Sequence, residues 1–205
     1  RNLLADYGMQ RSWLRVYDQR LQPRRVFWLI ETIHGEPINP DLFAKTFDTV
    51  AAHIQQQTGE RIGFIIDPTP LPSNGSYFGP TPEAMRRVNA ILAINPFNIT
   101  SDGISEAERI DVAESILVMW QNSGIPLMVP MLPGFDDHLI RPPGQIYGNH
   151  DAWRAEVASL AVAYQTGGVT LDVWNGFTEG YTFTPTMEDG NENYNLARHV
   201  FSQFR

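Results

Sequence analysis

The chain of 205 residues contains no cysteine, only one lysine and no long run of apolar side chains. Without cysteine, a disulfide framework, a thiol nucleophile and a cysteine-ligated zinc or iron–sulfur site are excluded. Its apolar segments are far shorter than the roughly 18 residues of a membrane-spanning helix, so we expect no membrane insertion. No glycine-rich phosphate-binding motif follows any apolar segment, which disfavours nucleotide-dependent dehydrogenases and kinases.

Acidic residues outnumber basic ones by 23 to 15, which gives a formal net charge of −8. Because a chain of this sign repels a phosphate backbone, we expect no nucleic-acid partner. Hydrophobic residues make up 42% of the chain, enough for a substantial core. The segment from about Leu3 to Leu21 has the pattern of a helix, and the given sequence begins at Arg1 in the middle of this pattern. We therefore expect an excerpt of a longer protein, for which secretion or a periplasmic location stays open.

Five short apolar segments predict strands that are buried on both faces. They are Val26–Ile30, Ile62–Ile66, Ala93–Phe97, Pro126–Leu132 and Val169–Trp174. Between them, apolar residues recur at helical spacing, and helix starts are indicated at Asn39-Pro40, at Thr81-Pro82 and by a capping box of Ser105 and Glu108. This alternation predicts successive right-handed βα units and a parallel sheet.

Two α/β architectures accommodate about five βα units. One is a TIM-type (β/α)8 barrel, of which this chain would be an incomplete part. The other is a doubly wound parallel sheet. The start within a helix favours the barrel, and we expect residues 1–205 to form a single domain, the C-terminal part of such a barrel. We interpret a cluster of arginines near the start of the chain as a solvated face or a contact with the preceding part: Arg11, Arg15, Arg20, Arg24 and Arg25.

In both architectures, ligands bind at the carboxyl ends of the strands, so the residues after each apolar segment are candidate site residues. They are Glu31 and His34, then Asp67, then Asn98, then Asp136 and Asp137, and last Asn175 and Glu179. Carboxylates among aromatic side chains are typical of sites for neutral, hydroxyl-rich ligands, and carboxyl pairs perform glycoside hydrolysis. Each acid taken singly has a second interpretation, as a helix cap or as the partner of an arginine.

Two motifs in the later part of the chain resemble those of a known family. The segment Val173-Trp174-Asn175-Gly176-Phe177-Thr178-Glu179-Gly180-Tyr181, followed by Pro185-Thr186, is similar to the W-N-E-W-x-E-G-T…E-P-T signature of the family 99 endo-α-mannosidase-like barrels. One strand earlier, Pro133-Gly134-Phe135-Asp136-Asp137 with Arg141 resembles their P-G-[WF]-D-[ND]…R segment. The resemblance, shared with family 71 α-1,3-glucanases, covers roughly residues 125–200. It implies a (β/α)8 barrel that acts on α-linked glycans.

The resemblance also implies roles for single residues. Glu179 corresponds to the family's general acid/base at the glycosidic oxygen. Gly176 stands where the family has a second glutamate, which is thought to assist the substrate 2-hydroxyl. A different carboxylate must therefore serve as base or nucleophile, and the candidates in order are Asp136, Asp67 and Glu31.

The remaining candidates are substrate contacts from the same loops. They are Asn175, Asp137, His34 and Asn98 for sugar hydroxyls, Trp174, Phe177 and Tyr181 for stacking on sugar rings, and Arg141 for the substrate or for an ion pair with Asp136 or Asp137. Two of them have equally good structural interpretations, Trp174 as a core aromatic and Asn175 as a strand terminator. No spacing typical of a zinc or calcium site occurs, so we expect no metal and no cofactor.

The leading hypothesis is a glycoside hydrolase that acts on an α-linked, mannan-like or glucan-like oligosaccharide or polysaccharide by carboxylate general acid/base catalysis. Two alternatives stay open. One is a non-catalytic glycan-binding relative in which Gly176 marks the loss of catalysis. The other is a barrel protein of polysaccharide assembly.

Overall fold

The computed structural model describes residues 15–18, 20–29, 39–68, 81–96, 105–138, 140, 142–148, 150–171, 175–176, 181–187 and 190–203. The elements in chain order are β1 (Arg15–Tyr17), β2 (Pro23–Leu29), α2 (Pro40–Thr58), β3 (Ile62–Ile66), α3 (Pro82–Arg86), β4 (Ile91–Ile94), α4 (Glu106–Gln121), β5 (Met128–Met131), β6 (Phe135–Asp136), β7 (Ile146–Tyr147), α5 (Asp151–Tyr164), β8 (Gly168–Leu171), β9 (Asn175–Gly176), β10 (Tyr181–Thr182) and α6 (Glu192–Ser202). None of the helices within these ranges combines the length and apolarity needed to cross a bilayer.

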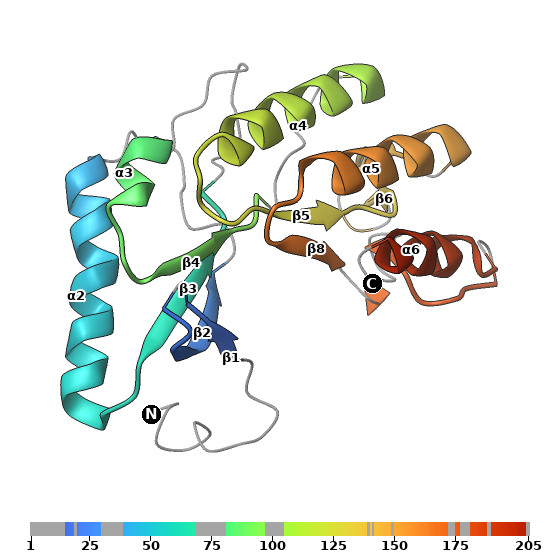
Figure 1. Ribbon diagram of the computed structural model, residues 1–205. Coiled ribbons are helices and arrows are strands. Elements are labelled where there is room, and N and C mark those ends of the chain that lie inside the picture. The colour runs from blue at the N-terminus through green and yellow to red at the C-terminus, as the bar shows by residue number, and fades with distance from the viewer. Residues whose placement is uncertain are drawn as a thin grey trace.

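The longer strands form a curled, mainly parallel sheet in which each βα unit lies beside the previous one (Figure 1). β2 pairs with β3 and β3 with β4 in parallel, a parallel bridge joins Ile94 to Leu127, and β5 pairs with β8 in parallel. A doubly wound sheet reverses its strand order at a switch point. Because the order here runs in one direction, the fold is that of a partial (β/α)8 barrel, and the doubly wound alternative is wrong.

Helices form an arc around the outside of the strands, and the main core lies between the two layers (Figure 1). Phe64 and Ile66 of β3 point into this core, where Trp120 of α4 is completely buried. Side chains of a strand alternate between its faces, so Ile65 points the other way. It packs in a second, smaller cluster with Val26 and with Ala93, which marks the inside of the barrel.

The sequence signals for helix starts are confirmed. Asn39 accepts hydrogen bonds from two N–H groups in the first turn of α2, and Thr81 accepts one in α3. At α4, Ser105 and Glu108 form a complete capping box, in which each side chain bonds the backbone N–H of the other. These bonds satisfy donors that a helix leaves free at its N-terminus, so the local sequence alone determines where these helices begin.

The helix predicted over roughly Leu3–Leu21 is wrong in its described part. Arg15–Tyr17 is a strand, antiparallel to β2. The chain reverses at Asp18, whose carboxylate accepts the N–H groups of Arg20 and Gln22, each at 2.9 Å. Side-chain bonds of this kind offer the backbone an alternative to the helix, which explains why a helical pattern did not form one.

The interpretation of the nearby arginines as a solvated basic face is also wrong for two of them. Arg24 donates from Nε to Asp18 at 2.8 Å. Arg25 is only 3% exposed and donates to both carboxylate oxygens of Glu60, at 2.8 and 2.9 Å. Arg15 and Arg20 are exposed, and Arg11 lies outside the described residues. The two inner arginines therefore tie the β1–β2 hairpin to the start of β3.

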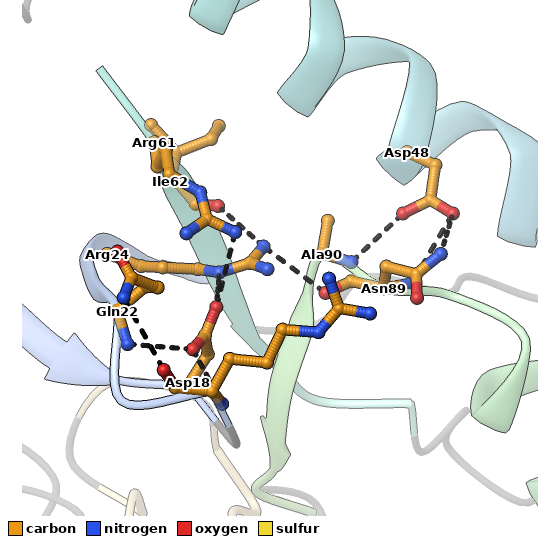
Figure 2. A network of polar contacts seen from close by, with 9 residues as sticks. Asp18, Gln22, Arg24, Asp48, Arg61, Ile62, Asn89 and Ala90 are labelled. Carbon is orange, nitrogen blue, oxygen red and sulfur yellow. Dashed lines mark hydrogen bonds and ion pairs between the residues drawn. The ribbon is translucent and has the colours of Figure 1, made fainter.

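The structure makes one stability prediction for acid pH. The N–H of Gln22 and the guanidinium of Arg24 hold the pKa of Asp18 at about 2, below its ordinary 3.8 (Figure 2). A lowered carboxyl pKa stabilises the fold above pH 3.8, and this stabilisation is lost as the pH falls towards 2. We expect the urea midpoint of the wild type to fall more steeply between pH 4 and pH 2 than that of Asp18→Asn. Equal slopes would contradict the assignment.

Candidate active site

Three polar side chains line the inside of the barrel at the carboxyl ends of its strands. Asp67 follows β3 and is completely buried, Asn95 follows β4 at 2% exposure, and Thr170 of β8 is 8% exposed. By strand alternation, Asp67 shares the inner face with Ile65, and Asn95 shares it with Ala93. This polar layer occupies the position where active sites of (β/α)8 enzymes lie.

Asn95 links two neighbouring strands of this layer. Its Nδ2 donates to the backbone carbonyl of Met128 on β5 at 3.0 Å and to Oγ1 of Thr170 on β8 at 3.1 Å. The side chain therefore fixes the spacing of β5 and β8, whose following segments carry the two motifs of the family resemblance.

We expect Asn95→Leu to lower the free energy of unfolding by about 1–3 kcal/mol, because Met128 and Thr170 keep buried acceptors after their donor is removed. Denaturant unfolding measures this loss. Asn122→Ala, at an exposed position just after α4, is the matched control and should leave stability nearly unchanged. A loss no larger than that of the control would show that the bridge contributes nothing.

Trp28 is the one large aromatic side chain on the inner face of β2, and it is 38% exposed. Trp28 pairs with Ile65 of β3, which lies two residues before Asp67. The indole is therefore next to the polar layer along the strand direction. An exposed indole beside buried polar groups is suited to stack on the apolar face of a sugar ring.

Asp136 lies on the short hairpin of β6 and β7 that follows β5. Its carboxylate accepts hydrogen bonds from the backbone N–H and from Nδ1 of His138. The bond from the imidazole lowers the pKa of Asp136 below its ordinary value. Asp136 is therefore ionised at neutral pH, which suits a base or nucleophile rather than an acid.

Asp137 has a structural role in the same hairpin. It is 3% exposed, and its Oδ1 accepts the N–H of Gln145 at 2.6 Å. Gln145 in turn accepts from Arg109 of α4 at 3.3 Å, and the guanidinium of Arg109 lies 4.2 Å from the ring centroid of Tyr147. These contacts show that Asp137 stabilises the hairpin of β6 and β7. Its predicted contact with substrate stays a prediction.

A second set of contacts fixes the end of the hairpin between two helices. Glu106 of α4 accepts the N–H of Gly148 at 2.5 Å and is 2.7 Å from Nε2 of His150, which caps α5 with its other ring nitrogen. The hydrogen bond from the Gly148 N–H is the main cause that lowers the pKa of Glu106, and the bond with His150 lowers it further. Trp153 completes the anchor through its Nε1, which donates to the carbonyl of Leu132 at 3.1 Å. Asp136 is thus held on a rigid support.

Several predicted site residues cannot be placed in this geometry. Asn175 and Tyr181 belong to a two-stranded antiparallel pair, β9 with β10, so Asn175 does not directly follow the fifth barrel strand as expected. That strand ends at Leu171 instead. Seven candidates lie outside the described residues: Glu31, His34, Asn98, Arg141, Trp174, Phe177 and Glu179.

Sequence reasoning missed Asn95 and Thr170. The predicted strand Ala93–Phe97 ends three residues early, at Ile94, because Pro96 has no N–H to donate to a sheet. The Asn-Pro pair was therefore the available signal for a strand end at Asn95 rather than at Asn98. Thr170 carried no such signal, since its role depends on a partner 75 residues away in the chain.

Metal binding finds no support in the described part of the chain, where no three His, Asp or Glu side chains lie close enough together to hold an ion. The chemistry available around the hairpin of Asp136 is that of carboxylates, amides and the imidazoles of His138 and His150.

The sequence matches no family model and no curated protein. Among solved structures, it is similar to a glycoside hydrolase family 99 endo-α-mannosidase from Bacteroides thetaiotaomicron, with a TM-score of 0.61 and 15% identity over 99% of this chain. It is also similar to an endo-α-mannosidase of this family and organism in complex with bis-tris propane, with a TM-score of 0.63 and 14% identity over 97% of the chain. The chain spans 60% and 61% of those two chains. The structural resemblance to family 99 barrels, and with it the partial (β/α)8 fold, is confirmed.

Proposed function

We propose that this chain is the C-terminal part of a glycosidase barrel that hydrolyses an α-linked glycan. One observation carries the proposal most directly: the ionised carboxylate of Asp136 follows a strand of a barrel whose solved structural relatives are endo-α-mannosidases. Residues 1–205 are expected to act as one domain. The solved relatives support a glycosidase-like fold.

Glu179 serves as general acid in this proposal and Asp136 as general base or nucleophile. The acid protonates the glycosidic oxygen as the bond to the anomeric carbon breaks. In the same step the ionised partner either takes a proton from the attacking water or attacks the anomeric carbon itself. In the second case water hydrolyses the resulting glycosyl–enzyme ester, with Glu179 now accepting the proton of that water. His138 supports the role of Asp136 as base or nucleophile, because its hydrogen bond keeps this carboxylate in the charged form.

Binding of the sugar is assigned to the inner face of the barrel. Trp28 provides an exposed indole for stacking, and the buried side chains of Asn95 and Asp67 form the polar layer next to it. Sugars combine apolar C–H faces with hydroxyl groups, so a surface that alternates aromatic and polar side chains fits them. The α-linkage rests on the motifs around Asp136 and Glu179 and on the solved relatives.

Product release from a panel of α-linked and β-linked polysaccharides by the intact protein tests this function. We expect oligosaccharides from an α-linked glycan, and a loss of roughly 10²–10⁴-fold in rate for Glu179→Gln. Glu156→Gln, at an exposed position of α5, is the matched control and should retain full activity.

Two results would overturn the proposal. Glycan binding without any product would mean that Gly176 marks a carbohydrate-binding protein built on an enzyme's scaffold. Turnover that requires an activated sugar donor would instead indicate polysaccharide assembly. Full activity of Glu179→Gln on a substrate with a poor leaving group would leave the enzyme in place and remove Glu179 as its acid.

A further inference from the structure

A cavity of about 310 Å³ opens at the amino ends of the strands, at the opposite edge of the sheet from the candidate active site. One wall is a face of α2 with Asp48, Ala52 and Gln55. The other wall consists of Arg24 near the start of β2 and Arg61 directly before β3, and the turn before β4 closes the cavity. Neither the family resemblance nor the proposed hydrolysis makes use of it.

The carboxylates around the cavity are already occupied by donors of the protein (Figure 2). Asp48 accepts the N–H of Ala90 at 2.9 Å and both the backbone and side-chain N–H groups of Asn89, at 3.3 and 3.4 Å. Asp18, behind the two arginines, accepts two backbone N–H groups as well as Arg24 and Arg61. Because these donors already bond the carboxylate oxygens, we do not expect Asp48 or Asp18 to bind a cation.

The arginines, in contrast, have donors in excess. Arg24 is held in place through Nε, which bonds Asp18, and through Nη1, which bonds the carbonyls of Ile62 and Asn89 at 3.4 and 3.3 Å. Within the described residues, these bonds leave its Nη2 for a ligand. Arg61 makes one contact of 3.4 Å with Asp18 within the described residues, and its side chain is 34% exposed. Two guanidinium groups thus present N–H donors to one cavity.

We propose that this cavity binds a small oxyanion, the phosphate or carboxylate group of a soluble metabolite. A guanidinium presents its donors as a planar fork that matches the oxygens of such groups. Arg24 is positioned before binding, so ordering it costs the ligand little. The short side chain of Ala52 leaves room opposite the arginines. Because two aspartates balance the two arginines in formal charge, affinity comes from directed hydrogen bonds, and a Kd on the order of 1 mM is expected for a minimal ligand.

Isothermal titration of the intact protein with inorganic phosphate and with acetate, each against chloride at the same ionic strength, tests the site. We expect saturable binding of at least one of the two anions. The stronger binder identifies phosphate or carboxylate as the recognised group. Arg61→Gln shortens the side chain and removes its charge and most of its donors, and it should weaken binding by about tenfold or more.

Two further variants keep the test independent of folding defects. Arg87→Gln removes an exposed arginine that pairs with Asp41 and Glu83, and it should bind the anion as the wild type does. Ala52→Leu fills the cavity without touching any charge and should abolish binding. Absence of saturable binding in the wild type, or unchanged binding in Arg61→Gln or in Ala52→Leu, would overturn the proposal. None of these outcomes depends on glycan hydrolysis.

Discussion

Replacing Asp136 with asparagine is expected to lower kcat for glycan hydrolysis by roughly 10²–10⁴-fold, the usual effect of removing a general base or nucleophile. The amide keeps an oxygen that can accept the N–H of His138, so the hairpin should fold as before. Initial rates on the glycan that the intact protein cleaves measure the effect. Urea midpoints of variant and wild type should agree, which separates a chemical loss from a structural one.

Asp111→Asn is the control for this variant, since Asp111 is an exposed aspartate of α4. It should retain the wild-type rate. If Asp136→Asn also retained that rate, the role of base would pass to the next carboxylate in order, Asp67, and Asp67→Asn would become the decisive variant. Loss of activity in Asp136→Asn, with the wild-type rate retained in Asp67→Asn, would assign the role to Asp136.

The pH profile provides a second check on Asp136. Hydrolysis needs this carboxylate ionised, and the hydrogen bond from His138 lowers its pKa, so activity should persist well into the acid range. Removing the imidazole in His138→Ala should let the pKa of Asp136 rise towards its ordinary value of 3.8. The acid limb of kcat/KM should then move to higher pH. An unmoved acid limb would mean that another group controls it.

Much of the architecture was predictable because local signals determined it. The bounds of β3 agree with the predicted Ile62–Ile66, since an uninterrupted apolar run is buried on both faces of the sheet. The starts of α2 and α4 follow from capping side chains within three residues of the helix. The barrel was expected from the start within a helix, whose described part is a strand, and from the resemblance carried by the motifs around Asp136 and Glu179. The order of the parallel strands and the solved structures confirm it.

The error at the start of the chain arises from contacts that only the folded chain makes. A helical pattern at Arg15–Tyr17 became a strand because β2 offered a pairing edge and Asp18 closed the hairpin. The structural role of Asp137, whose predicted contact with substrate stays a prediction, likewise depends on Gln145 and, through it, on Arg109 of another helix. Such contacts leave no periodicity in the sequence, whereas Asn95 was readable from the proline that follows it.

The largest expected effect on stability comes from Trp120→Ala. Trp120 lies in the last turn of α4, is completely buried, and packs in the main core between the helices and the strands. Removing its indole deletes the largest fully buried side chain of the described residues. The surrounding helices and strands cannot close around the space, because the backbone of β4 and β5 is fixed by sheet pairing. We therefore expect a loss of about 3–5 kcal/mol in the free energy of unfolding.

Guanidinium unfolding of the variant, with the slope of the transition compared as well as its midpoint, measures this loss. Val118→Ala is the matched control, because Val118 lies two residues earlier in α4 and is 39% exposed; it should cost about 0.5 kcal/mol or less. Domains of this size have a total stability of about 5–15 kcal/mol, so Trp120→Ala should remove a large fraction of it. A loss similar to that of Val118→Ala would contradict the packing of α4 against the strands. Glu106 and Arg109, which hold the hairpin of Asp136, belong to the same helix. The same result would therefore also contradict the described position of this hairpin.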